Sequence, residues 1–289
     1  MRFARPRRAA RPMGIGMRVA FGFVLASCSG PSEPPEGTLV ASFTYPSPPR
    51  RGDCDHKPGA AGATNGLSSR DGLRYNVRAP ANLDSTYAHP LLMVYAPAGH
   101  SAEQNEALTR LTTEATGGGF IVAYVGSRPL SRQTLVGLAR IPGDVAAAWC
   151  VDPNRVYATG HSDGGTVSTA LALLQETRGT VSAIAPSAAG FSGKDLEGFQ
   201  CPQPMPVMIM HGKRDTHFPG WGKEAASWWA RCNACDLAAT PVPQDDGCIT
   251  FAGCRPGGRT DYCEGTGAHG DWPPLRHRMI QFLQAAGSP

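Results

Sequence analysis

Short apolar runs alternate along the chain with amphipathic and polar stretches, the pattern expected of strands and helices taken in turn. Six runs rich in Val, Leu, Ile, Met and Ala predict strands over residues 73–77, 91–95, 120–125, 155–158, 183–186 and 206–210. Apolar residues at helical spacing predict helices over residues 103–116, 166–175, 222–231 and 275–286. Residues 249–263 predict a hairpin that turns at residues 255–258. This order indicates an α/β domain with a mostly parallel central sheet and helices on both faces.

The length and composition allow one hydrophobic core large enough for a single domain. The chain has 289 residues, of which 41% are hydrophobic, and we expect residues 52–289 to form a single domain. Residues 189–206 leave room for only a loop and a short turn, so no lid domain is expected. Five arginines among the first eleven residues supply much of the formal charge of +4, which indicates no nucleic-acid partner. We expect a monomer.

The N-terminus has the features of an export signal: basic residues, an apolar run over residues 19–26 and small residues before Cys28. Leu25-Ala26-Ser27-Cys28 resembles the lipobox of bacterial lipoproteins, in which the cysteine carries the lipid. We therefore expect residues 1–27 to be a signal peptide and a lipid on Cys28 to be the only membrane anchor. The lipid would hold the protein on the bacterial cell envelope. If the segment is instead an ordinary secretory signal, the protein would be released outside the cell. Residues 28–51, rich in Pro, Ser and Glu, predict a flexible tether.

Nine cysteines less Cys28 leave eight, an even number that allows four disulfides in an oxidising compartment. Buried free thiols are one alternative, and a metal site among the five C-terminal cysteines is another. Only Cys232 and Cys235 are close in sequence, whereas zinc sites usually have two close pairs or added histidines. Disulfides are therefore favoured, and no metal or organic cofactor is expected.

The strongest chemical signal is Gly160-His161-Ser162-Asp163-Gly164, a G-x-S-x-G sequence between a predicted strand and a predicted helix. In a nucleophile elbow the serine occupies a strained turn, which flanking glycines allow to close. Ser162 is therefore the candidate nucleophile, and a glycine turn that happens to contain serine is the alternative. The Asp163 carboxylate suits a helix start, so only the Asp163 backbone N–H is given a role.

A nucleophilic serine needs a base, and the base needs an orienting acid. Asp215 follows the strand predicted over residues 206–210, where sites of open α/β sheets lie, whereas Asp245 and Asp246 follow no strand. His269 lies in a glycine-rich loop before the last helix, as the order serine, acid, histidine requires. Three other histidines are interpreted as surface or supporting residues: His211, His217 and His277.

Two backbone N–H groups would bind the oxyanion, one from Asp163 and one from the loop after an early strand. Pro97 in that loop has no N–H, so the donor is Ala98 or Gly99, and we favour Ala98. His161 and Trp272 are the candidates for substrate binding. A Trp272 ring near His269 suits an aryl acid or a polyester chain, although it could equally fix the start of the closing helix.

Together these segments resemble the polyhydroxybutyrate depolymerase and feruloyl or acetylxylan esterase group of α/β-hydrolases. The matching residues are 71–75, 151–157, 160–165, 211–215 and 268–273. The resemblance implies the α/β-hydrolase fold and a disulfide between Cys235 and Cys254. The chain departs from the group at Ala96-Pro97, where a His-Gly pair is usual, and in a short segment over residues 127–147.

These observations predict hydrolysis of a carboxylic ester through an acyl-enzyme. An open cleft suits a polymeric polyhydroxyalkanoate or an aryl ester such as a feruloyl ester. A peptidase or acyltransferase with the same three residues is one alternative, because substrate choice lies in loops. A catalytically inactive cell-surface binding lipoprotein is the other.

Overall fold

The computed structural model describes residues 37–47, 52, 54, 57–244 and 246–287. These residues belong to one compact unit, Pro34–Pro289. The predicted signal peptide, Cys28 and most of the predicted tether lie outside the described residues. Within the described residues, no helix combines the length and apolarity that a bilayer crossing requires.

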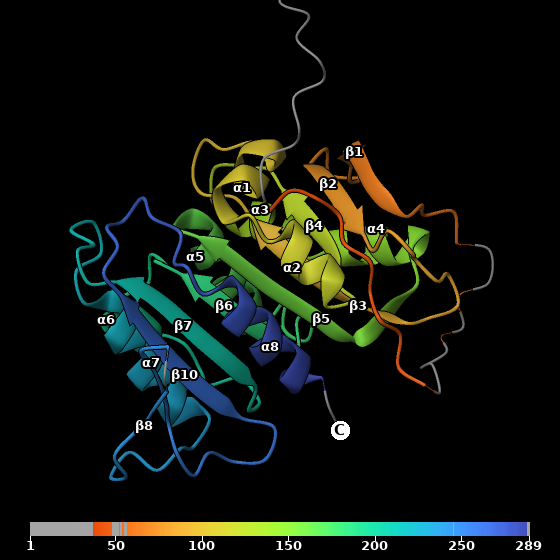
Figure 1. Cartoon of the computed structure of the whole chain (residues 1–289). Coiled ribbons are helices and arrows are strands. Elements are labelled where there is room, and N and C mark those ends of the chain that lie inside the picture. The colour runs from red at the N-terminus through yellow and green to blue at the C-terminus, as the bar shows by residue number, and fades with distance from the viewer. Residues whose placement is uncertain (1–36, 48–51, 53, 55–56, 245, 288–289) are drawn as a thin grey trace, which may run out of the picture. The chain divides into compact units, whose positions relative to one another are not determined.

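In the part of the chain that the structure describes, ten strands form one sheet in the order β1-β2-β4-β3-β5-β6-β7-β10-β9-β8. Their bounds are β1 Gly62–Ser68, β2 Arg74–Ala79, β3 His89–Tyr95, β4 Ile121–Val125, β5 Val151–His161, β6 Ala183–Ser187, β7 Pro206–Gly212, β8 Val242–Pro243, β9 Cys248–Thr250 and β10 Arg259–Gly265. The six strands from β4 to β10 in this order are parallel, and the pairs at both ends are antiparallel (Figure 1). The predicted mostly parallel sheet is confirmed.

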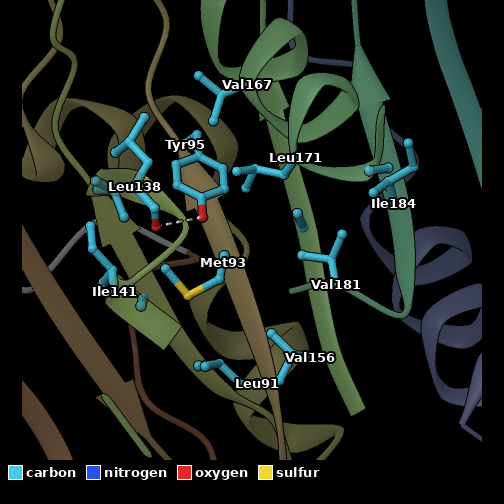
Figure 2. Packing of buried hydrophobic residues seen from close by; sticks show 14 of the residues in the cluster. Leu91, Met93, Tyr95, Leu138, Ile141, Val156, Val167, Leu171, Val181 and Ile184 are labelled. Atoms are coloured by element: carbon cyan, nitrogen blue, oxygen red, sulfur yellow. Dashed lines mark hydrogen bonds between the residues drawn. The ribbon is translucent and has the colours of Figure 1, made fainter. Parts of the chain in front are cut away.

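Eight helices cover the two faces of this sheet within the described residues. Their bounds are α1 Ala102–Thr109, α2 Thr112–Gly117, α3 Arg132–Leu138, α4 Ile141–Ala148, α5 Asp163–Leu173, α6 Gly193–Glu197, α7 Trp221–Cys232 and α8 Arg276–Ala286. Alternate β3 side chains face opposite sides. Met93 and Tyr95 pack with Leu138 and Leu171, as Figure 2 shows, whereas Val94 belongs to the core beneath α1, α2 and α8. Both faces are buried, as a parallel sheet requires.

The helix predicted over residues 103–116 is two helices. Arg110 ends α1 in the left-handed conformation with φ 51°, and its N–H donates to the Glu106 carbonyl. The break turns Leu111 into the core, where it is fully buried. Nothing in the local sequence signals this turn, because Arg110 carries no intrinsic preference for it.

Residues 37–47 differ from the predicted tether, because they pack on the domain. The Ala41 N–H donates to the Thr116 hydroxyl at 2.9 Å, and the Tyr45 hydroxyl donates to the Asn82 carbonyl at 3.0 Å. The Phe43 and Tyr45 rings lie edge to face, 4.9 Å apart. The prediction rested on average composition and gave no weight to these two aromatic rings, which supply apolar surface to bury.

Four disulfides cross-link the domain: Cys54–Cys150, Cys201–Cys232, Cys235–Cys254 and Cys248–Cys263. The predicted disulfides are confirmed, including the Cys235–Cys254 bridge that the family resemblance implied. The sulfur atoms that a metal site would use as thiolates are therefore bonded to one another.

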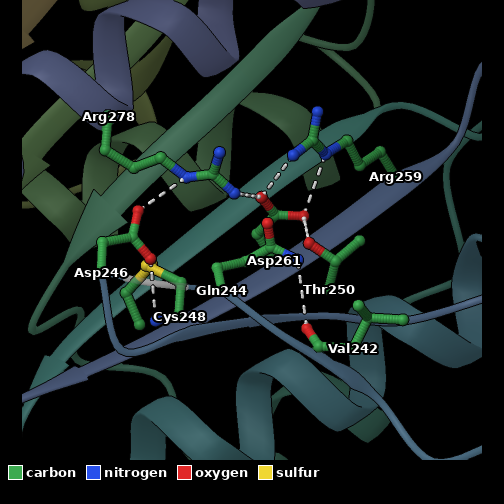
Figure 3. Close-up of a disulfide and its surroundings, with 9 residues drawn as sticks. Val242, Gln244, Asp246, Cys248, Thr250, Arg259, Asp261 and Arg278 are labelled. Carbon is green, nitrogen blue, oxygen red and sulfur yellow. Dashed lines mark hydrogen bonds and ion pairs between the residues drawn. A yellow bond between two sulfur atoms is a disulfide. The ribbon is translucent and has the colours of Figure 1, made fainter.

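The Cys248–Cys263 bridge joins β9 to β10 beside a buried charge cluster (Figure 3). The fully buried Asp261 accepts hydrogen bonds of 2.8 Å from both Arg259 and Arg278. Such paired guanidinium contacts compensate the burial of a carboxylate. Because β10 leads into the loop that carries His269, this cluster and the bridge fix the base of that loop.

Candidate active site

Ser162 lies in the sharp turn between β5 and α5. Its backbone has φ 54° and ψ −116°, a conformation that a residue with a side chain rarely adopts. The neighbouring glycines are required by close contacts: a Cβ on Gly164 would lie 1.9 Å from the Tyr95 carbonyl oxygen, and one on Gly165 would lie 2.6 Å from that of Ser187. The sequence thus forms a nucleophile elbow in which α5 starts directly against β3 and β6.

The structure brings Ser162, His269 and Asp215 into one hydrogen-bonded chain. The Ser162 Oγ lies 2.9 Å from His269 Nε2, and His269 Nδ1 lies 2.9 Å from Asp215 Oδ2. Ser162 follows β5, Asp215 follows β7 and His269 follows β10, so all three lie at the carboxyl ends of parallel strands. With a proton on Nδ1 for Asp215, Nε2 is free to accept the serine proton.

The Asp215 carboxylate is buried and receives several donors. Its Oδ1 accepts the backbone N–H groups of His217 at 2.8 Å and Phe218 at 2.9 Å. Burial is the largest single influence and opposes ionisation, but the hydrogen bonds from His269, Phe218 and His217 together outweigh it and lower the pKa of Asp215. Asp215 is therefore a carboxylate at neutral pH.

His161 is only 3% exposed, which contradicts its predicted role in substrate binding. Its Nδ1 lies 3.0 Å from the Ser187 hydroxyl, and its Nε2 is hydrogen-bonded to the backbone carbonyl of His269. Burial lowers the pKa of His161, so the ring is neutral. A neutral ring with its proton on Nε2 donates to the His269 carbonyl and accepts from Ser187. His161 thus supports the backbone of the base rather than the substrate.

Trp272 is half-buried and packs against the core cluster that includes α8. Its ring lies edge-on to His161 with the centroids 6.2 Å apart. These contacts are those of a packing residue, and a contact between Trp272 and substrate stays a prediction.

Two residues beside His269 were missed as candidates for substrate contact. The exposed His217 ring lies 4.7 Å from the His269 ring, and the Phe218 ring stands edge-on to it at 4.9 Å. Phe218 also stacks on Trp221 at 4.6 Å. The sequence did contain a clue to them, because His217 and Phe218 follow Asp215 by two and three residues. The turn in which Asp215 accepts their N–H groups also places their rings beside His269.

The buried His211 supports the turn formed by residues 215–218. Its Nε2 donates to the Phe218 carbonyl at 2.9 Å and lies 3.6 Å from Asp215 Oδ2. Burial lowers the pKa of His211, which keeps its ring neutral beside the carboxylate.

The loop that carries Ala98 lies beside the helix start that carries Asp163. A Cβ on Gly164 would lie 3.1 Å from the backbone carbonyl carbon of Ala96, so the two segments are in contact. The His100 N–H donates to the Pro97 carbonyl at 3.2 Å and closes the loop around Ala98. In the described part of the chain, no group of three or more metal-binding side chains is arranged to hold an ion.

No protein-family model matches the chain. Feruloyl esterase B of Piromyces equi is 25% identical over 219 residues, which cover 65% of this chain and 40% of that protein. Feruloyl esterase D of Neurospora crassa is 25% identical over 214 residues, which cover 64% of this chain and 69% of that protein. The match therefore spans well under half of the first relative's length.

Among solved structures, the acetyl xylan esterase from Aspergillus awamori superposes with a TM-score of 0.55 and 15% identity, covering 78% of this chain and 99% of that one. The S-formylglutathione hydrolase of Staphylococcus aureus superposes with a TM-score of 0.54 and 15% identity, covering 78% and 98%. The fold is therefore the α/β-hydrolase fold, as predicted. The resemblance to the esterase group of this fold is confirmed by the sequence relatives together with these structures.

Proposed function

We propose that the protein is a serine esterase that hydrolyses carboxylic esters through an acyl-enzyme. The observation that carries this proposal is the hydrogen-bonded chain from Ser162 through His269 to Asp215, with Ser162 held in a strained elbow. Similarity to two feruloyl esterases supports the same chemistry.

In the proposed reaction the Ser162 Oγ attacks the ester carbonyl while His269 Nε2 takes the serine proton. His269 then returns the proton to the leaving alcohol, and a water molecule repeats both steps on the acyl-enzyme. The ionised Asp215 orients His269 and stabilises the imidazolium that forms. The N–H groups of Asp163 and Ala98 are assigned to the oxyanion.

We assign an aryl ester of the feruloyl type as the preferred substrate class. The exposed His217 ring and the Phe218 ring beside His269 offer aromatic surface next to the reacting carbonyl. The names of the two sequence relatives point to the same class. A polyhydroxyalkanoate ester is the competing class, and it would be distinguished by comparing both substrates directly.

The test is hydrolysis of methyl ferulate, a short hydroxyalkanoate oligomer and 4-nitrophenyl acetate by purified protein. Ser162→Ala should lower kcat by about 10⁴-fold or more, because the nucleophile acts as a unit with its base. A fluorophosphonate should label the parent protein and not this variant. Parent-like turnover by Ser162→Ala would refute the proposal, and turnover of anilides in place of esters would favour the peptidase alternative.

We also propose that the protein is exported and that a lipid on Cys28 anchors it to the membrane. The four disulfides support an oxidising compartment. Cys28→Ser should move the protein from the membrane fraction to the soluble fraction of the bacterial cells that produce it. Unchanged membrane association would argue against the lipid anchor.

A further inference from the structure

A cavity of about 340 Å³ opens between the β1–β2 end of the sheet and the start of α1. Its lining includes side chains from three segments that are far apart in sequence, among them Arg74, Asn76, His100, Ser101, Glu103 and Arg128. The proposed ester hydrolysis uses none of these residues.

The sheet register ties this cavity to the edge that carries the nucleophile. Tyr75 pairs with Val125, Val125 with Tyr95, and Tyr95 with Gly160, two residues before Ser162. Neighbouring strands are about 4.8 Å apart, so these three steps place the cavity about 14 Å along the sheet edge from the nucleophile strand. An extended substrate that reaches Ser162 can therefore also reach the cavity.

The lining carries an excess of positive charge. Arg74 and Arg128 are exposed, and Arg128 uses one N–H for the Gly72 carbonyl, which leaves most of the five guanidinium donors available. Glu103 already accepts a 2.8 Å hydrogen bond from Asn76, which lowers the pKa of Glu103. The lining therefore contains two guanidinium groups and one carboxylate, an excess of one positive charge that favours an anion.

His100 connects the cavity to the loop assigned to the oxyanion. Its N–H donates to the Pro97 carbonyl at 3.2 Å, and its carbonyl accepts the Ser127 N–H at 2.9 Å. His100 and Ser127 both line the cavity, while Pro97 precedes Ala98. A ligand in the cavity thus contacts a residue that holds the Ala98 loop in place.

We infer that this cavity is an accessory subsite for a carboxylate-bearing sugar unit and that the ester to be cleaved is attached to a polysaccharide, an inference that rests on the proposed ester hydrolysis. Guanidinium groups bind carboxylates through paired N–H donors, a geometry that Arg74 and Arg128 offer. The hydroxyls of Ser101 and Ser127 and the Glu103 carboxylate supply partners for sugar hydroxyls. The ester to be cleaved then lies further along the same chain, at Ser162.

The test is titration calorimetry of the Ser162→Ala variant, which measures binding without turnover. Trigalacturonic acid is the probe, and galactotriose is the matched neutral trisaccharide. Trigalacturonic acid should bind saturably and about tenfold or more tightly than galactotriose, and Arg74→Gln with Arg128→Gln should abolish most of that difference. The control is Arg255→Gln, which removes one exposed positive charge from the β9–β10 turn and should keep the affinity for trigalacturonic acid within about twofold.

Equal affinity for the two trisaccharides, no saturable binding, or an equal loss in Arg255→Gln would overturn the inference. Circular dichroism and Tm of each variant verify folding, and Arg74→Lys with Arg128→Lys, which keeps the charge and loses the paired donors, should give intermediate affinity. Hydrolysis of 4-nitrophenyl acetate by the parent protein tests the ester chemistry separately. Hydrolysis without trigalacturonic acid binding refutes the subsite alone, whereas binding without hydrolysis refutes the esterase proposal.

Discussion

The buried ring of His161 gives the sharpest prediction, because it links the elbow to the base without touching the reacting atoms. His161→Ala removes two hydrogen bonds, one to the Ser187 hydroxyl and one to the His269 carbonyl. Each lost neutral bond costs about 0.5–1.5 kcal/mol, and a buried partner left unsatisfied costs about 1–3 kcal/mol. We therefore expect the free energy of unfolding to fall by about 2–4 kcal/mol.

The same substitution should lower kcat more than it raises KM. The backbone of His269 loses its hydrogen-bond donor, and a displacement of about 1 Å in catalytic geometry can cost about 10²-fold in rate. The rate of fluorophosphonate labelling of Ser162 should fall in parallel, because labelling needs the same base. His161→Gln, whose amide offers both a donor and an acceptor, should recover part of the activity.

The matched control is His277→Gln on α8, where the histidine is exposed and pairs with Glu114. It should leave kcat and KM within about twofold of the parent values. If His161→Ala loses stability but keeps kcat and the labelling rate, His161 is a packing residue and the positioning argument is refuted.

Two further predictions concern pH and the disulfides. Burial lowers the pKa of His89, His161 and His211, so as pH falls the unfolded state takes up protons first, near the ordinary histidine pKa of about 6.5. Tm should therefore fall as pH drops from about 7 to 5, and an equal Tm at both pH values would contradict these burials. Cys248→Ser with Cys263→Ser should lower stability by about 2–5 kcal/mol and reduce activity through the His269 loop. Full activity at a lowered Tm would show that the bridge does not position that loop.

Sequence reasoning located strands β2 to β7 and the three residues that meet at the site, because each has a recognisable local sequence pattern. Ser162 lies in a glycine-rich pattern, Asp215 follows a predicted strand, and His269 lies in a glycine-rich loop before the last helix. The supporting role of His161 could not be predicted from the local sequence, because its hydrogen-bond partners lie in β6 and in the loop after β10. A substrate-facing histidine and a supporting one look alike until the fold shows which is buried.

The same limit applies to features that tertiary packing decides. The break at Arg110 depends on how Leu111 meets the core, and the packing of residues 37–47 depends on where Phe43 and Tyr45 find partners. The left-handed conformation at Arg110 could not be predicted, because the residue there is not glycine. Composition therefore predicted that a domain exists, but it placed the N-terminal boundary of that domain too late in the chain.

The geometry of the two outermost strands opposes pairing with a strand of another molecule. At one margin, β1 contains Gly62 and Gly66 with positive φ, and its register shifts between Thr64 and Leu67. At the other margin, β8 is only two residues long. Irregular or very short margins offer a poor template for an incoming strand, so they oppose edge-to-edge aggregation. By this means the protein would keep its long hydrophobic sheet from growing into fibrils.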